Sequence, residues 1–407
     1  MTLRHTRHIV PFLLLVFLTS CTKIQVTQVE REKLFGLSYG YLDDELAFYD
    51  LDSNNAGPDS QIFMRDGMFY ISNSESGKVL QFTSFGDLLA VYYNPEISTV
   101  SSFPASKEGG STQVATTRKA ITYPFNHPTY LAVDFHKRLF VLDQLPDSRQ
   151  EYDSDAQVLL RDVILRFNSE GQFIDYIGQE GAGGTPFSPV TGIYVNSKDE
   201  LIVVAMQQSS IHVFWYTSEG ALLFHVPISF SDLPSPYDTG VKAISTLEKV
   251  VPDLNLKKIY LKIDYFIEVT DTETQSNAGI RFERSSVYPF NLETEKYEEM
   301  LDIPAFEDSD EDSQQTDSVK KPYEFIGTTA NGWLFFSTPA GSGYEFELLD
   351  SKSHRILRCN LSVDSDESVY NALMLSSDGI LSALLASRTE ASVVWWRTDK
   401  LIGEIRK

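Results

Sequence analysis

The sequence feature that most constrains this chain is a repeating unit of short apolar runs, seen most clearly between residues 127 and 181. Four such runs follow one another there, at residues 130–134, 139–143, 163–167 and 173–177. Their length and apolar content are typical of half-buried strands. Gly171 lies in the turn before the last run and can supply the positive φ that such bends need. Four antiparallel strands joined in this way predict one blade of a β-propeller.

The same pattern recurs along the chain and gives six copies. Their first strands are predicted to begin near residues 61, 130, 191, 242, 323 and 371. The copy between residues 241 and 303 is the least regular, with a long second strand predicted from 258 to 269. The last copy is expected to end with strands at 392–397 and 401–405. We therefore expect an all-β fold, a six-bladed β-propeller formed by residues 61–407.

Insertions between the predicted strands fall on one side of the ring. In an antiparallel blade, the turns that join strand one to two and strand three to four emerge on one face, and all other connections emerge on the opposite face. The first class is short and defines a plain face. The second class defines a long-loop face, with segments 94–129, 144–157, 229–241, 270–278 and 302–322. Because loops on a rigid scaffold carry function, we expect the long-loop face to bind the ligand or partner.

The first 20 residues read as an export signal, with a basic start and an apolar run at 9–18 that is too short to span a bilayer. The ending at residues 18–21, Leu-Thr-Ser-Cys, resembles the lipobox of bacterial lipoproteins. This resemblance implies cleavage before Cys21 and lipidation of that thiol, with palmitate among the acyl chains. An ordinary secretory signal that ends in a chance cysteine is the alternative. Residues 21–60 are then a lipidated tether and a segment, rich in aromatics at 34–52, that packs on the propeller without a predicted strand.

The repeated unit is similar to an NHL repeat. The residues that carry this resemblance in the second copy are Pro128 at the start, Asp134 at the end of the first strand, Gly171 in the last turn and the Ile177-Gly178 step. Three other copies match in outline, and the fourth and sixth are divergent. The resemblance implies a six-bladed β-propeller, usually a binding platform and sometimes an enzyme.

Charge and cysteine content exclude some classes of function. The net charge of −23 becomes −25 when the export signal is removed, with 32 basic against 57 acidic residues. Nucleic acid would be repelled, so it is not an expected partner. With Cys21 modified, Cys359 is left alone, so no disulfide is expected, and its place in an alternating strand predicts a small buried side chain.

The candidate binding residues lie on the predicted long-loop face. Asn126 and His127 precede the first strand of the second copy, where propeller enzymes hold metal ligands or acid-base groups, but a second ligand at an equivalent position is missing. A structural role for His127 is the alternative. Asp308, Asp310 and Asp312 belong to an acidic run that lacks the glycine and glutamate of a calcium loop, so we expect a solvated loop able to dock a basic partner. No metal ion or cofactor is predicted.

Together these features predict a non-enzymatic interaction scaffold. The protein is expected in the bacterial cell envelope, attached to a membrane by its N-terminal lipid on the periplasmic side or the cell surface, where it binds protein, peptide or glycan. The alternatives are a metal-dependent propeller hydrolase or lyase of the lactonase kind, and an envelope-assembly factor.

Overall fold

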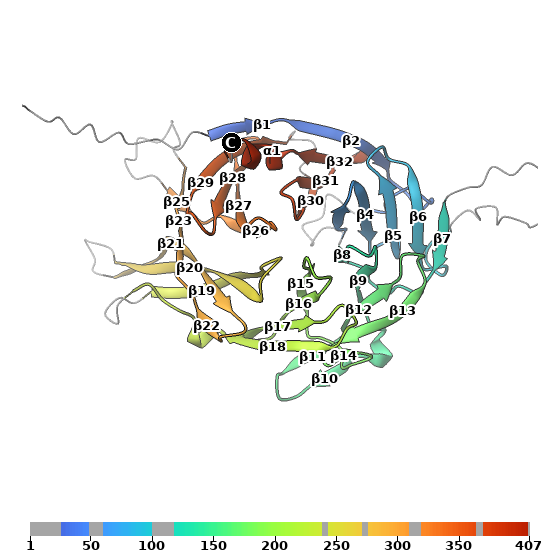
Figure 1. Cartoon of the computed structure of the whole chain (residues 1–407), viewed down its shortest axis with the longest axis horizontal. Coiled ribbons are helices and arrows are strands. Elements are labelled where there is room, and N and C mark those ends of the chain that lie inside the picture. Colours follow the sequence, from blue (N-terminus) through green and yellow to red (C-terminus); the bar gives the residue numbers. More distant parts are fainter. Residues whose placement is uncertain are drawn as a thin grey trace, which may run out of the picture.

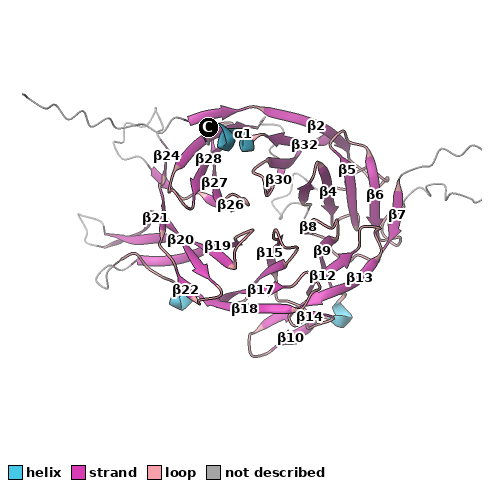
Figure 2. Cartoon of the chain, viewed as in Figure 1, coloured by secondary structure: helices cyan, strands magenta, loops and turns pink. Residues whose placement is uncertain are grey.

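The computed structural model describes residues 26–48, 60–99, 118–237, 243–270, 276–308, 319–363 and 369–405. Six antiparallel sheets stand around a common axis and form a closed ring (Figures 1 and 2). The all-β, six-bladed propeller expected from the repeated unit is therefore confirmed. The export signal and Cys21 lie outside the described residues.

Blades one to three follow one another along the chain. Blade one contains β3 (Ile62–Arg65), β4 (Met68–Asn73), β5 (Lys78–Thr83) and β6 (Leu88–Tyr93), with β7 (Lys119–Thr122) added in parallel at its outer edge. Blade two contains β8 (Leu131–Val133), β9 (Leu139–Gln144), β12 (Asp162–Phe167), β13 (Phe173–Gly178) and β14 (Gly181–Ala182). Between β9 and β12 lie the short helix η1 (Asp147–Arg149) and a hairpin of β10 (Glu151–Asp153) and β11 (Val158–Leu160). Blade three contains β15 (Val190–Val195), β16 (Leu201–Met206), β17 (Ser210–Tyr216) and β18 (Leu222–Ser229), followed by η2 (Phe230–Asp232).

Blade four is the longest. It contains β19 (Ala243–Pro252), β20 (Lys258–Thr270), β21 (Asn277–Asn291), β22 (Lys296–Tyr297) and β23 (Leu301–Ile303), and a hairpin of β24 (Phe306–Asp308) and β25 (Val319–Lys321) leads to blade five. Blade five contains β26 (Glu324–Thr328), β27 (Trp333–Ala340), β28 (Gly343–Asp350) and β29 (Ile356–Ser362), with β1 (Val26–Val29) parallel to its outer strand. Cys359 is fully buried in β29, as predicted.

Blade six is assembled from both ends of the chain. Its inner strands are β30 (Tyr370–Leu375), β31 (Leu381–Ala386) and β32 (Glu390–Trp396), and its outer strand is β2 (Arg31–Ser38). The β2–β32 pairing is antiparallel, and Figure 1 shows β1 and β2 running along the outside of the last strands. Two predictions were wrong: residues 401–405 form no strand, and the propeller does not begin at 61. The last residues form the helix α1 (Thr398–Ile405), because β2 already occupies the edge that a fourth strand would take.

The core lies between neighbouring blades. Ile164 of blade two, for example, belongs to one cluster with Val203 and Phe214 of blade three, all at most 3% exposed. Side chains alternate across each strand, so both faces of a blade are buried against its neighbours. The part of the chain that the structure describes holds no helix with the length and apolarity of a membrane span.

The turns of the plain face share one capping pattern. The side chain of the residue directly after the first strand accepts a hydrogen bond from the backbone N–H four residues later. Four blades show it, through Asp134 to Arg138, Asn196 to Glu200, Thr329 to Trp333 and Ser376 to Ile380, at 2.8 to 3.0 Å. A capped turn satisfies its backbone donors locally, which keeps the connections on the plain face short.

Candidate functional site

Asn126 and His127 lie at the entrance to the first strand of blade two, on the long-loop face. Their backbone N–H groups donate to the carboxylate of Asp143, with the His127 bond at 2.6 Å to Oδ1. Asn126 is exposed and His127 is half-buried. Asp143 is the penultimate residue of β9, so the second strand of the blade fixes the loop that leads into the first. This contact gives the two residues a positioning role in the ring.

Asp143 is itself an unusual carboxyl group. It is 4% exposed, and burial raises its pKa to about 6, although the bonds from His127 and Asn126 oppose this shift. A second buried carboxylate, Asp162, accepts a hydrogen bond from the backbone of Val190, and burial raises its pKa as well. The sequence analysis did not single out either aspartate, because both follow ordinary strand patterns.

The acidic segment is described only at its base. Asp308 is the last residue of β24, and this strand pairs with β25 across the connection between blades four and five. Asp310 and Asp312 lie outside the described residues. Asp308 follows the strands of blade four along the chain, whereas His127 lies at the entrance to blade two.

The described projection with the longest strands on the long-loop face belongs to blade four. Most strands of the ring have four to eight residues, whereas β19, β20 and β21 have 10, 13 and 15. The long second strand predicted from 258 to 269 is thus confirmed as β20. We define the ribbon as residues 243–247, 265–270 and 277–284, which lie beyond the part of the sheet covered by β22 and β23. In Figure 1 these strand ends reach out past the rim of the ring.

One face of the ribbon carries a row of apolar side chains. Ile244 pairs with Phe266, and Phe266 pairs with Phe282, with ring centroids 5.8 Å apart. Glu268 pairs with Ile280, and each lies two residues from the phenylalanine of its strand, so these residues share one face. Ile244 is 46% exposed and Ile280 is 58% exposed, which places two large apolar side chains at a solvent-facing surface. This surface is suited to binding another protein.

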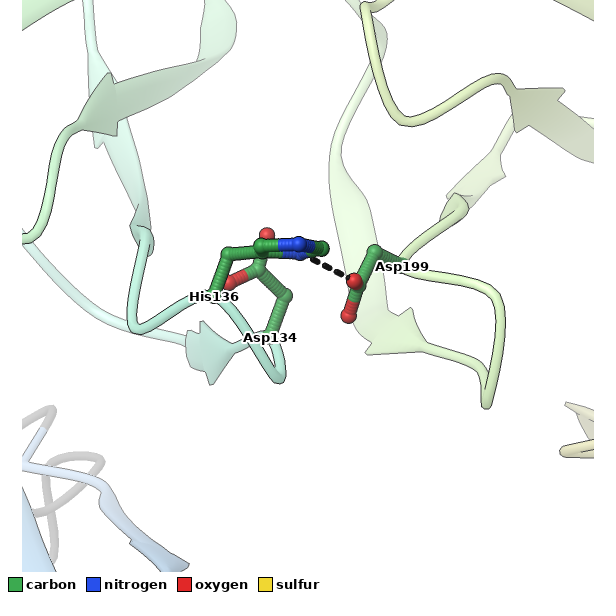
Figure 3. Close-up of side chains that lie close together, drawn as sticks. All are labelled: Asp134, His136 and Asp199. Carbon is green, nitrogen blue, oxygen red and sulfur yellow. Dashed lines mark hydrogen bonds and ion pairs between the residues drawn. The ribbon is translucent and has the colours of Figure 1, made fainter.

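A cluster of possible metal ligands lies on the opposite, plain face (Figure 3). Asp134 and His136 belong to the first turn of blade two, and Asp199 belongs to the first turn of blade three. Their ligand atoms lie within 4.8 Å of one another. The sequence analysis did not single out His136. It could not find Asp199, which is 63 residues away and meets His136 only through the packing of neighbouring blades.

The chemistry of this cluster does not favour a cation. Asp134 is fully buried and accepts hydrogen bonds from both the backbone N–H and the Nε of Arg138. Asp199 accepts from the backbone N–H of Phe135 at 2.7 Å and binds Nδ1 of His136 at 2.5 Å. A divalent ion would have to displace or approach the guanidinium of Arg138. The cluster therefore joins blades two and three as a hydrogen-bonded ion-pair network.

No protein-family model and no curated protein matches this sequence. Among solved structures, the chain is similar to an ulvan lyase of polysaccharide lyase family 25, with 11% identity over 90% of this chain and 83% of the lyase and a TM-score of 0.39. It is similar to a streptogramin B lyase at 12% identity, over 90% of this chain and all of that chain, with a TM-score of 0.35. The β-propeller domain of the Trilobed protease from Pyrococcus furiosus is 7% identical over 83% of this chain and 95% of that domain, with a TM-score of 0.39. These similarities concern the fold alone.

Proposed function

We propose that this protein is a lipid-anchored, non-enzymatic interaction scaffold of the bacterial cell envelope that binds a protein partner through the blade-four ribbon. The observation that carries the proposal is the apolar row on the ribbon, with Ile244 and Ile280 about half exposed on a projection. Large apolar side chains in a contiguous exposed patch stabilise association when a partner covers them.

The path of the N-terminal strands supports a defined orientation of the ring. β1 runs parallel to β29 and pairs Val26 with Arg358, which follows the plain-face turn at residues 351–355. The chain therefore enters the ring from the plain-face side. With an acyl chain on Cys21, at most about 17 Å of extended chain separates the lipid from Val26. Lipidation would thus hold the plain face toward the bilayer and present the long-loop face away from it.

The acidic segment adds an electrostatic contribution to this proposal. It follows β23, which pairs with β21, the strand that carries Ile280. Asp308, Asp310 and Asp312 add negative charge to the connection between blades four and five. A partner with an apolar patch and a basic rim fits both features. Its association rate is expected to fall as salt screens the charges.

Site-specific photo-crosslinking in intact cells tests the proposal. A photoreactive residue placed at Ile280 is expected to yield a discrete adduct with one protein. The same residue placed at Arg281 points to the opposite face of the same strand and is expected to yield much less of it. A third position, Lys198, lies exposed in a plain-face turn and is the control for nonspecific capture. Equal adducts at all three positions, or none at Ile280, would contradict binding through the ribbon.

A separate measurement tests the anchor. Mass spectrometry of the mature protein is expected to find an acylated N-terminal Cys21, and a Cys21→Ala variant is expected to lose membrane attachment. An unmodified N-terminus or cleavage at another residue would contradict the anchor, without bearing on the ribbon.

A further inference from the structure

A cavity of about 490 Å³ lies at the centre of the ring and is lined by residues from the inner strands of all six blades. Its walls combine polar and apolar surface, and the apolar part includes Ile62, Leu131, Ile193, Val251, Ile326 and Leu375. This volume falls within the range of pockets that hold small organic ligands, roughly 300 to 1,000 Å³. Two basic side chains, Arg65 and Lys249, also line the cavity.

Arg65 is buried and has no polar partner in the described part of the chain. Only 8% of it is exposed, and its guanidinium carbon lies 4.3 Å from the ring centre of Phe135 and 5.9 Å from that of Phe63. No hydrogen bond or ion pair joins the guanidinium of Arg65 to another described residue. An arginine remains charged at neutral pH and carries five N–H donors in a planar fork, so its binding capacity is unused in the free protein.

The acids around Arg65 are committed to other groups. Asp66, Asp134, Asp199 and Asp378 are close enough to raise its pKa, although burial is the larger effect and lowers it. Each already has a polar partner: Lys137, Arg138, His136 and Ser376, in that order. These carboxylates keep the guanidinium charged but leave its donors free to bind a ligand.

Lys249 approaches the same cavity from the other side. It belongs to blade four, which stands opposite blade one in a ring of six, and it is partly buried. Burial lowers the pKa of Lys249, and the nearby Glu248 and Glu324 oppose this shift. Glu248 itself lies 3.7 Å from the buried Nζ of Lys262. Lys249 therefore provides a second nitrogen donor at the cavity, with no side-chain hydrogen bond or ion pair to another described residue.

We infer that the central cavity binds a small amphiphilic anion, whose carboxylate or phosphate group is held by Arg65 and whose apolar body lies against the aliphatic walls. The forked donors of arginine match the paired oxygens of such a group. A ligand with one anionic group is favoured over an extended polyanion, because four carboxylates lie near Arg65 and the chain carries a net charge of −23. This site is independent of the partner-binding ribbon, so either inference can fail without the other.

Titration of the full chain in a nonionic detergent, followed by ligand-observed NMR, tests this inference. The probes are hexanoate, hexyl phosphate and the neutral hexanol. Hexanoate or hexyl phosphate is expected to bind at one site, and the tighter of the two identifies the source of the anionic group. Arg65→Met is expected to weaken binding about 10- to 100-fold, the usual worth of a hydrogen bond to a charged group. Lys249→Met should weaken it less, and the matched control Lys198→Gln should leave it unchanged.

Three results would overturn the inference: hexanol binding as tightly as hexanoate, equal affinity in the wild type and Arg65→Met, or binding of neither anion by the wild type. If Arg65→Met does not fold, Arg65→Lys replaces it. This variant keeps the charge and loses the fork, so it is expected to bind several-fold more weakly. Unchanged affinity in Arg65→Lys would then contradict a bidentate contact.

Discussion

The ring and the blade-four ribbon share the same strands but differ in what covers their side chains. Within β20, Ile259 and Ile263 are fully buried between blades, whereas beyond residue 265 the strand leaves the ring and is no longer fully buried. Within β21, Val287 is fully buried and Ile280 is 58% exposed. Strand pairing continues through both parts, with register shifts between Tyr265 and Phe266 and between Val269 and Thr270. The comparison shows that pairing between strands is enough to form them. Burial against neighbouring blades then distinguishes the strand segments that stabilise the fold from those that are free to bind a partner.

The largest expected effect comes from opening the ring. Removing residues 26–38 deletes β2, which supplies the outer strand of blade six, and with it the packing of Phe35 on Phe69 and Phe82. The remaining edge of β32 would be exposed and the ring no longer closed. The variant is expected to lose the cooperative unfolding transition seen by circular dichroism. A truncated protein that keeps the full transition would show that blade six does not depend on β2.

A smaller loss is expected when a ring residue of blade four is truncated. Ile263→Ala removes a fully buried side chain between blades three and four and should lower the free energy of unfolding by about 2–5 kcal/mol. Denaturant titration measures this change. A loss under about 1 kcal/mol would mean that blade four is not packed into the ring.

The buried carboxyl of Asp143 predicts a pH dependence of the ring. Its pKa in the folded protein is about 6, above its ordinary value of 3.8, so the folded state keeps a proton that the unfolded state releases between about pH 4 and 6. This contribution to stability is present below pH 4 and lost as the pH rises through 6, by about 2–3 kcal/mol. Asp143→Asn keeps an acceptor for the His127 N–H and should remove this dependence. Parallel stability curves for the two proteins from pH 4 to 7 would contradict the raised pKa.

The smallest effect is expected in the ribbon. Ile280→Ala shortens a side chain that no neighbouring blade covers, so the free energy of unfolding should change by less than about 0.5 kcal/mol. The same denaturant titration that detects Ile263→Ala provides the comparison. A cost above about 2 kcal/mol would place Ile280 in the core.

The sequence alone was sufficient to predict the strands of blades that form from continuous segments of the chain. Blade two was predicted strand by strand, because its four strands and their turns lie within about 50 residues. β2 was missed, because its partner β32 is more than 350 residues away and residues 31–38 show only weak alternation. Residues 401–405 read as a strand, yet they form α1, whose Ile402 is 4% exposed. A local sequence pattern cannot reveal that the edge of β32 is already occupied by a strand from the other end of the chain.

The candidate sites show the same limit. The topology correctly located Asn126 and His127 at the mouth of blade two, and the length of β20 signalled an extended blade. The exposure of Ile244 and Ile280 could not be predicted, because their residue types are the same as those of the core. Arg65 was missed for a similar reason: it ends an ordinary inner strand, and only the closed ring reveals the cavity that it lines.

Excision of the ribbon tests the central claim of this account most directly. Replacing residues 267–281 of the full chain with a tight Asn-Gly turn between the paired Phe266 and Phe282, and shortening β19 to match, removes the projection and keeps the ring. The account predicts that the free energy of unfolding changes by no more than about 1 kcal/mol, since few buried side chains are lost. It also predicts that the partner captured at position 280 no longer copurifies. Retention of that partner by the ribbonless ring, with its fold intact, would contradict the account.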